Sequence, residues 1–209
     1  MRIEVKNFKR QKLFDTYHKM TNPYIYLTTK IDVTKIINYC KKHKNYYATI
    51  GYFILAAANS LDCFKYRLED DKIYKYDSLK SSSVELLEND DIIYVNCDFN
   101  SYDKYINNYL KEKERCISNK EVVETKDQGV IWFSCTPWFS YESLISPYDK
   151  NITIPQFIWD KYEKSGEKYF MNLTIMIHHG FADGKDIAGF LDILKDKINN
   201  IDKITKEVC

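Results

Sequence analysis

The segment 169–198 constrains the fold more than any other part of the chain. Its first residues, YFMNLTIMIHH at 169–179, are mostly apolar or β-branched and predict a buried strand. Gly180 and Gly184 bracket a short turn, because glycine allows backbone angles that other residues avoid. Apolar side chains then recur at helical spacing over 185–198, at Ile187, Phe190, Leu191, Leu194 and Ile198. A buried strand that leads into an amphipathic helix predicts a sheet covered by helices.

The rest of the chain mixes strands and helices without strict alternation. Strands are expected over 23–34, 82–88, 91–99, 130–139 and 152–159, and helices over 33–43, 48–61 and 101–117. Asp32 and Thr34 are suited to cap the first of these helices. The third helix places Tyr105, Ile106, Tyr109 and Leu110 on one face. The segment 65–77 predicts a hairpin that turns at Asp70–Asp71, and 118–129 predicts a polar loop.

These elements together predict an α+β fold, an α/β sandwich. We expect a mixed, largely antiparallel sheet with helices packed against it. The chain has no linker rich in proline, glycine or serine and no internal repeat, so we expect a single domain over residues 1–209.

The charge balance and the cysteines argue against several classes of protein. A net charge of +1, from 31 basic and 30 acidic residues, does not favour a nucleic-acid partner, which requires a basic surface. No apolar run is long enough to span a bilayer, and residues 1–14 lack the apolar core of a signal peptide. The six cysteines are scattered with no C-x-x-C pair, so we expect free thiols in a reducing cytoplasm and no zinc site.

Two of the four histidines, His178 and His179, are adjacent at the end of the predicted strand. Successive side chains of a strand point to opposite faces, so the two imidazoles are not expected to share one site or one metal. His179 then lies at the strand end with Asp183 in the turn, where a neutral imidazole could accept a proton from a hydroxyl. The alternatives are a core histidine bonded to backbone, and a His–Asp metal site, which would require a helix across the two glycines.

Four segments carry a further combined pattern. They are NFKRQKLFDTY at 7–17, YLTTKIDVTKI at 26–36, WFSCTPWFSYESL at 132–144 and HHGFADG at 178–184. In this order, over nearly the whole chain, they resemble the chloramphenicol acetyltransferase family. Plant alcohol acyltransferases and peptide-synthetase condensation domains share the H-H-x-x-x-D-G signature but are much longer and carry it mid-chain. The length therefore favours the short, trimeric branch.

The resemblance implies a role for each matching residue of the reaction site. His179, the second histidine of the pair, would be the general base that takes the proton of an acceptor hydroxyl as its oxygen attacks the thioester carbonyl of acetyl-CoA. The Ser134 hydroxyl would stabilise the resulting oxyanion. Asp183 and Arg10 would form an ion pair that holds the turn in place. The resemblance also implies acetyl-CoA as a cosubstrate, no permanent cofactor or metal, and a homotrimer with sites at its subunit interfaces.

Five further positions match family residues that contact the two substrates. Tyr162 matches a tyrosine that lies against the adenine of the coenzyme, and Tyr47 matches another residue near the coenzyme. Tyr17, Leu144 and Ile158 match residues of the acceptor pocket.

Several positions depart from the family pattern. Ile158 stands where the family usually has a threonine that helps to hold a water near the intermediate. Trp132 replaces a commonly polar residue, and Thr16 stands where an aromatic side chain often lines the acceptor pocket. Lys185–Asp186 replaces a Phe-His pair. The acceptor pocket thus departs from the pattern more than the base, the oxyanion donor and the ion pair do.

Three functions follow from these residues. The first is a chloramphenicol O-acetyltransferase, and the second is an O-acetyltransferase of the same mechanism with a different hydroxyl acceptor. The third, from another class, is a non-catalytic trimeric protein that binds a hydrophobic ligand. The presence of His179, Ser134, Asp183 and Arg10 counts against the third.

Overall fold

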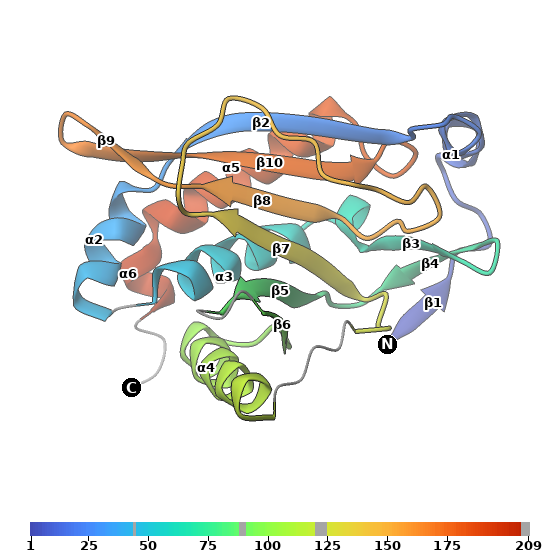
Figure 1. The fold of residues 1–209 in the computed structure, drawn as a ribbon. Coiled ribbons are helices and arrows are strands. Elements are labelled where there is room, and N and C mark those ends of the chain that lie inside the picture. The colour runs from blue at the N-terminus through green and yellow to red at the C-terminus, as the bar shows by residue number, and fades with distance from the viewer. Residues whose placement is uncertain (44, 88–90, 120–124, 206–209) are drawn as a thin grey trace.

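The computed structural model describes residues 1–43, 45–87, 91–119 and 125–205, and its centre is a seven-stranded sheet (Figure 1). The strands are β2 (Tyr24–Asp32), β5 (Lys80–Leu86), β6 (Ile92–Cys97), β7 (Val130–Thr136), β8 (Gln156–Asp160), β9 (Glu163–Ser165) and β10 (Lys168–His178). Their order is β2-β10-β8-β7-β5-β6, and β9 pairs with β10. The β5–β7 and β7–β8 pairs are parallel and the others are antiparallel, which confirms the predicted mixed, largely antiparallel sheet.

Helices cover one face of this sheet, because the apolar side chains of the strands gather there. Figure 1 shows α2 (Thr34–His43), α3 (Tyr46–Asn59) and α5 (Gly184–Asn199) behind the sheet, with α4 (Tyr102–Asn119) at its lower edge. Helix α3 contacts α2, α4 and α5 and is buried almost all round, as its apolar sequence predicts. The short helix α6 (Ile201–Ile204) follows α5.

A smaller sheet and one helix bring the N-terminal segment to the end of β10. The small sheet has the order β1 (Arg2–Glu4), β4 (Lys72–Tyr76), β3 (Tyr66–Glu69), and β3 follows the short helix η1 (Asp62–Lys65). The β3–β4 hairpin turns at Asp70 and Asp71 as predicted, and both have positive φ, of 48° and 60°. Helix α1 (Gln11–His18) then lies beside the C-terminal end of β10, where Phe14 stacks on His178.

The structure corrects some of the expected elements. Leu110 was expected on the inner face of α4, but its side chain is 41% exposed, because α4 lies along the sheet edge and buries only a narrow stripe against β6. Helix α4 also continues to Asn119, into the predicted polar loop. The strands β1 and β9 and the helix α1 were not expected. Residue 88 of the predicted strand 82–88 and residues 120–124 of the predicted loop lie outside the described residues.

The cysteines of the described residues are thiols that form no disulfide with one another. Cys40, Cys63, Cys97 and Cys116 are buried and Cys135 is partly buried, whereas Cys209 lies outside the described residues. Burial raises the pKa of the Cys63, Cys97 and Cys135 thiols to about 12, which makes them poor nucleophiles. No helix among the described residues is long and apolar enough to cross a bilayer.

Candidate active site

The residues 178–183, called here the histidine turn, connect the end of β10 to the start of α5. The backbone N–H groups of Phe181 and Ala182 both donate to the carbonyl oxygen of His178, at 2.9 and 3.3 Å. The N–H of His179 donates to the carbonyl oxygen of Pro23 at 2.8 Å, which ties the turn to the segment before β2. Because these bonds fix the backbone, the turn presents its side chains in defined directions.

The His179 imidazole is held in one tautomer. Its Nδ1 lies 3.0 Å from the carbonyl oxygen of Ala182. A carbonyl oxygen only accepts, so Nδ1 carries the proton and Nε2 keeps its lone pair. The ring of Tyr17 stacks on the imidazole, with centroids 3.9 Å apart and planes 20° apart. The ring is partly exposed, so its free Nε2 can receive a proton from a bound molecule.

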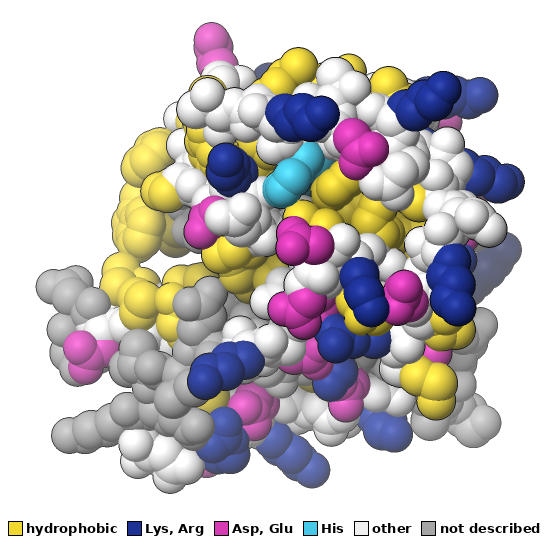
Figure 2. Space-filling view, turned by 90° about the vertical axis from the view of Figure 1, so that its right-hand side faces the viewer, with side chains coloured by type: hydrophobic (Ala, Val, Ile, Leu, Met, Phe, Trp, Pro, Cys, Tyr) yellow, Lys and Arg dark blue, Asp and Glu magenta, His cyan; other side chains and the backbone are white. Residues whose placement is uncertain are grey.

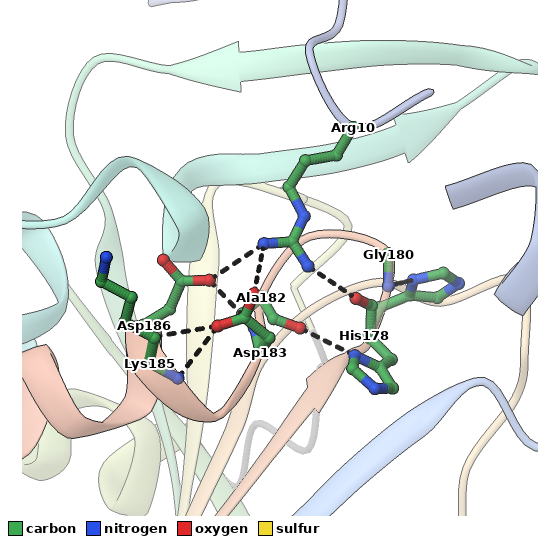
Figure 3. Close-up of polar contacts among 8 residues, drawn as sticks. Arg10, His178, Gly180, Ala182, Asp183, Lys185 and Asp186 are labelled. Atoms are coloured by element: carbon green, nitrogen blue, oxygen red, sulfur yellow. Dashed lines mark hydrogen bonds and ion pairs between the residues drawn. The ribbon is translucent and has the colours of Figure 1, made fainter. Parts of the chain in front are cut away.

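Asp183 is the N-cap of α5 and forms a reciprocal capping box with Asp186. The Oδ1 atom of Asp183 accepts from the N–H groups of Lys185 and Asp186, at 2.9 and 3.3 Å. The Oδ2 atom of Asp186 accepts from the N–H of Asp183 at 2.9 Å. These bonds satisfy donors that the first turn of a helix otherwise leaves unpaired. They fix the point at which the histidine turn becomes helix (Figure 3).

Arg10 holds the same turn from the other side. Its Nη1 lies 3.0 Å from Oδ2 of Asp183 and 3.2 Å from Oδ2 of Asp186, and its Nη2 donates to the carbonyl oxygen of His179 at 3.4 Å (Figure 3). Burial opposes the charge of Asp183, but the bonds from Arg10 and from the helix N–H groups outweigh it and lower the pKa of Asp183. One guanidinium thus binds two residues of the histidine turn, His179 and Asp183, and one residue of the first turn of α5, Asp186.

We expect Asp183→Asn to change stability little, because the ion pair is shared and partly exposed. The side chains of Arg10, Asp183 and Asp186 are 24%, 43% and 34% exposed, and asparagine also caps helices well. The double variant Asp183→Asn/Asp186→Asn should lower the free energy of unfolding by about 1–2 kcal/mol and also lower activity, since it removes both carboxylates. Urea unfolding measures the first quantity, and Asp192→Asn on the exposed face of α5 is the control. Equal losses in single and double variants would contradict the shared pair.

His178 is part of the packed interior, whereas its neighbour His179 is partly exposed. Its ring is fully buried, stacks on Phe14 at a centroid distance of 4.8 Å, and packs against Phe181 at 5.4 Å with the planes tilted by 44°. Burial lowers the pKa of His178 to about 4, so the imidazole is neutral. Gly180 is required here, because a Cβ on it would lie 2.6 Å from Cα of Phe14. The expectation that the two histidines do not share a site agrees with these contacts.

Ser134 lies on the face of β7 that points away from the helices. It lines a hollow of about 220 Å³, whose other walls are Val84, Tyr94, Trp132, Phe133, Gln156 and Ile158. Ile158 is the direct partner of Ser134 across the β7–β8 pair and is 7% exposed. The departures Trp132 and Ile158 therefore border the Ser134 hydroxyl.

The structure does not bring Ser134 and His179 of one chain together. Ser134 is in register with Ile158, and Ile158 is in register with Thr174, five residues before His179. At the usual strand dimensions this register separates the two residues by roughly 16 Å along the strand and about 10 Å across two strand spacings. A base and an oxyanion donor that serve one carbonyl must both lie about 3 Å from the reacting atoms.

The two residues predicted to bind the coenzyme lie near the Ser134 end of the sheet. Tyr162 follows β8, is 38% exposed and packs its ring against Tyr46 and Tyr169. The Tyr47 hydroxyl donates to the carbonyl oxygen of Val84 at 3.1 Å, and burial raises the pKa of Tyr47. Coenzyme binding by both residues stays a prediction.

The three residues predicted for the acceptor pocket lie apart within one chain. Tyr17 stacks on His179, whereas Ile158 lies beside Ser134. Leu144 is partly buried in the segment between β7 and β8. In the same segment, the Tyr141 hydroxyl donates to the carbonyl oxygen of Ile158 at 2.8 Å. One chain therefore supplies two separate parts of the predicted pocket.

Sequence reasoning missed three residues that shape the site. Phe14 and His18 both contact His178, and they were missed because α1 itself was not predicted. Asp186 was noted only as a departure, although its D-x-x-D spacing with Asp183 is the signature of a capping box. Among the described residues, no group of three or more His, Cys, Asp or Glu side chains is placed to hold a metal ion.

The face that carries α1 and the end of β10 combines apolar and charged side chains. Figure 2 shows a histidine side chain at the surface of this face, between basic and acidic side chains and beside an apolar area.

The family model and the curated relatives indicate one family by sequence. The family model for chloramphenicol acetyltransferase matches residues 1–195. Chloramphenicol acetyltransferase 3 of Escherichia coli is 26% identical over 95% of this chain and 97% of its own, and the chloramphenicol acetyltransferase of Campylobacter coli is 27% identical over 95% and 98%. A solved structure of a chloramphenicol acetyltransferase superimposes with a TM-score of 0.80 at 20% identity, over 95% of this chain and 100% of its own.

Proposed function

Because the chain belongs to the chloramphenicol acetyltransferase family, we propose that it acetylates a primary hydroxyl of chloramphenicol with acetyl-CoA. The family and the similar proteins make the chain a CoA-dependent acyltransferase. Beyond this activity, we propose the acceptor, the reacting residues and a single domain. We also propose a cytoplasmic location, where acetylation of the antibiotic would confer resistance. The observation that supports it most is the fixed tautomer of His179, which leaves Nε2 free as a base.

In the proposed reaction, Nε2 of His179 takes the proton of the acceptor hydroxyl while the hydroxyl oxygen attacks the thioester carbonyl. The new C–O bond produces a tetrahedral intermediate, and the Ser134 hydroxyl donates to its oxyanion. The intermediate collapses by breaking the C–S bond. The imidazolium then returns the proton to the sulfur, which gives the acetyl ester and free CoA.

We propose that His179 and Ser134 of each site come from different chains of a homotrimer. This assembly is supported by their separation within one chain, since no small substrate could contact both at hydrogen-bond distance. Tyr17 would then accompany His179 from one chain, and Ile158 would accompany Ser134 from the other.

The test is the release of CoA thiol by the purified protein. With acetyl-CoA and chloramphenicol we expect release that depends on chloramphenicol and one acetyl ester formed for each thiol. Release with other alcohols but never with chloramphenicol would favour the second function, an O-acetyltransferase with a different hydroxyl acceptor. Ile158 and Trp132 are the observation that favours this alternative, because both depart from the family pattern beside Ser134. No release with any acceptor would contradict both enzymes and favour a binding protein.

We expect Ile158→Thr to raise kcat on chloramphenicol by about fivefold, the worth of one ordinary hydrogen bond. Ile158 is the cross-strand partner of Ser134, so a threonine there would place a hydroxyl beside the oxyanion donor and could hold a water. The KM for acetyl-CoA should not change. Ile158→Val is the matched control, because it has the shape of threonine without the hydroxyl. If valine raised kcat as much as threonine, the gain would come from space and not from the hydroxyl.

A further inference from the structure

His18, the last residue of α1, contacts the buried histidine of the histidine turn. Its Nδ1 lies 3.4 Å from Nε2 of His178, and the two ring centroids are 5.6 Å apart. The His18 ring also stacks on Phe14, at 5.2 Å and an interplanar angle of 13°. His18 is partly exposed, so its imidazole faces solvent on one side and the buried His178 on the other.

The direction of the contact between the two imidazoles follows from a second hydrogen bond. The N–H of Gly180 lies 3.0 Å from Nδ1 of His178, and a backbone N–H only donates. Nδ1 of His178 is therefore unprotonated, and the neutral ring carries its proton on Nε2. That N–H points at Nδ1 of His18, which must accept. Acceptance requires His18 to be neutral, with its own proton on Nε2.

The same helix end also contacts the proposed base. Tyr17, the residue before His18, stacks on His179 at 3.9 Å. Phe14, one turn earlier, stacks on both His178 and Phe181. The C-terminal turn of α1 thus covers both imidazoles of the histidine turn, and the His18–His178 bond is its polar attachment.

We propose that His18 is a positioning residue for acetyl transfer: its neutral Nδ1 accepts from His178, fixes the end of α1 and so sets Tyr17 against His179. The inference rests on the proposed function of His179 as the base. His18 itself touches no substrate in this scheme and acts through Tyr17.

Two variants distinguish the role of the hydrogen-bond acceptor of His18 from the role of its ring. His18→Asn keeps an acceptor, Oδ1, near the place of Nδ1 and does not titrate. His18→Phe keeps a ring against Phe14 but leaves the buried N–H of His178 without a partner. At pH 8 we expect His18→Asn to retain kcat within about threefold, and His18→Phe to lower kcat about tenfold with an unchanged KM for acetyl-CoA. His43→Asn is the control, because His43 is exposed at the C-terminal end of α2.

The comparison of the two variants gives a readout that a merely structural role would not move. If the ring alone mattered, His18→Phe would be the better substitute, whereas the proposal makes the acceptor in His18→Asn the better one. Equal kcat in the Asn and Phe variants would overturn the proposal.

Nitrogen-15 NMR of labelled histidine tests the positioning without reference to activity, and the chain has only four histidines. We expect His178 to be protonated on Nε2 and unprotonated on Nδ1 at pH 8. The His179 resonances should match the wild type in His18→Asn and shift in His18→Phe. The opposite tautomer of His178, or unchanged His179 resonances in both variants, would overturn the proposal. A wild type that transfers no acetyl group while these shifts occur would contradict the proposed function and not the bond.

Discussion

Replacement of His179 by alanine should lower kcat for acetyl transfer roughly 10²–10⁴-fold, the usual contribution of a general base. Stability should change little, because the ring is partly exposed and makes one hydrogen bond, to Ala182, and one stacking contact, with Tyr17. Single-turnover formation of acetylchloramphenicol measures the chemical step, and the urea midpoint measures the free energy of unfolding.

The neighbouring His178→Ala variant should behave in the opposite way. It removes a fully buried ring between Phe14 and Phe181 and the acceptor of the Gly180 N–H, so it should cost about 2–5 kcal/mol of stability. At a temperature where both variants remain folded, His179→Ala should be the less active of the two. If the folded His178 variant were equally inactive, the assignment of the base to His179 would fail.

Ser134→Ala should lower kcat about 10²–10³-fold, as expected for the loss of one oxyanion donor. The KM for acetyl-CoA should change little, because the hydroxyl acts on the charge that develops in the transition state. Ser82→Ala is the matched control: Ser82 lies opposite Trp132 on the adjacent strand β5, is buried, and its hydroxyl has no hydrogen-bond partner among the described residues. A collapse of acetyl-CoA binding with normal turnover would give Ser134 a different role.

A mixture of the two inactive variants tests whether the site is shared between chains. In a trimer that contains both His179→Ala and Ser134→Ala chains, one of the three interfaces combines an intact His179 with an intact Ser134. Random reassembly after joint unfolding and refolding should therefore restore about a quarter of the wild-type activity, because about three quarters of the trimers are mixed. Recovery is impossible if each chain forms its own site, so a mixture without activity would refute the shared assembly.

The elements that sequence reasoning predicted best are those whose own residues determine them. The long strand β10 and the helix α5 carry uninterrupted periodic patterns, and the Asp70–Asp71 hairpin depends on two adjacent residues. Helix α1 was missed because its eight residues have no side-chain cap at Arg10 and bury only Phe14. Its stability depends on contacts with β10 and the histidine turn, far away in the sequence.

In the candidate site, too, the features that depend on neighbouring residues were predictable, and the contacts between distant residues were not. Strand alternation separated His178 from His179, since it depends on neighbouring residues alone. The contact between His18 and His178 joins residues 160 positions apart, and no local pattern indicates it. The separation of Ser134 from His179 depends on the register of three strands, which the sequence of any one strand does not determine.

The ion pairs of Arg10 also have a consequence for how the protein is made. Arg10 leaves the ribosome well before its partners, because Asp183 and Asp186 are synthesised 173 and 176 residues later. Domains acquire structure during synthesis from the N-terminal end, and contacts between distant residues form late. The segment that orients the histidine turn therefore has no partners until the start of α5 has been translated. A nascent chain that stops before α5 can form the hairpin and the first helices, but it cannot assemble the reaction site.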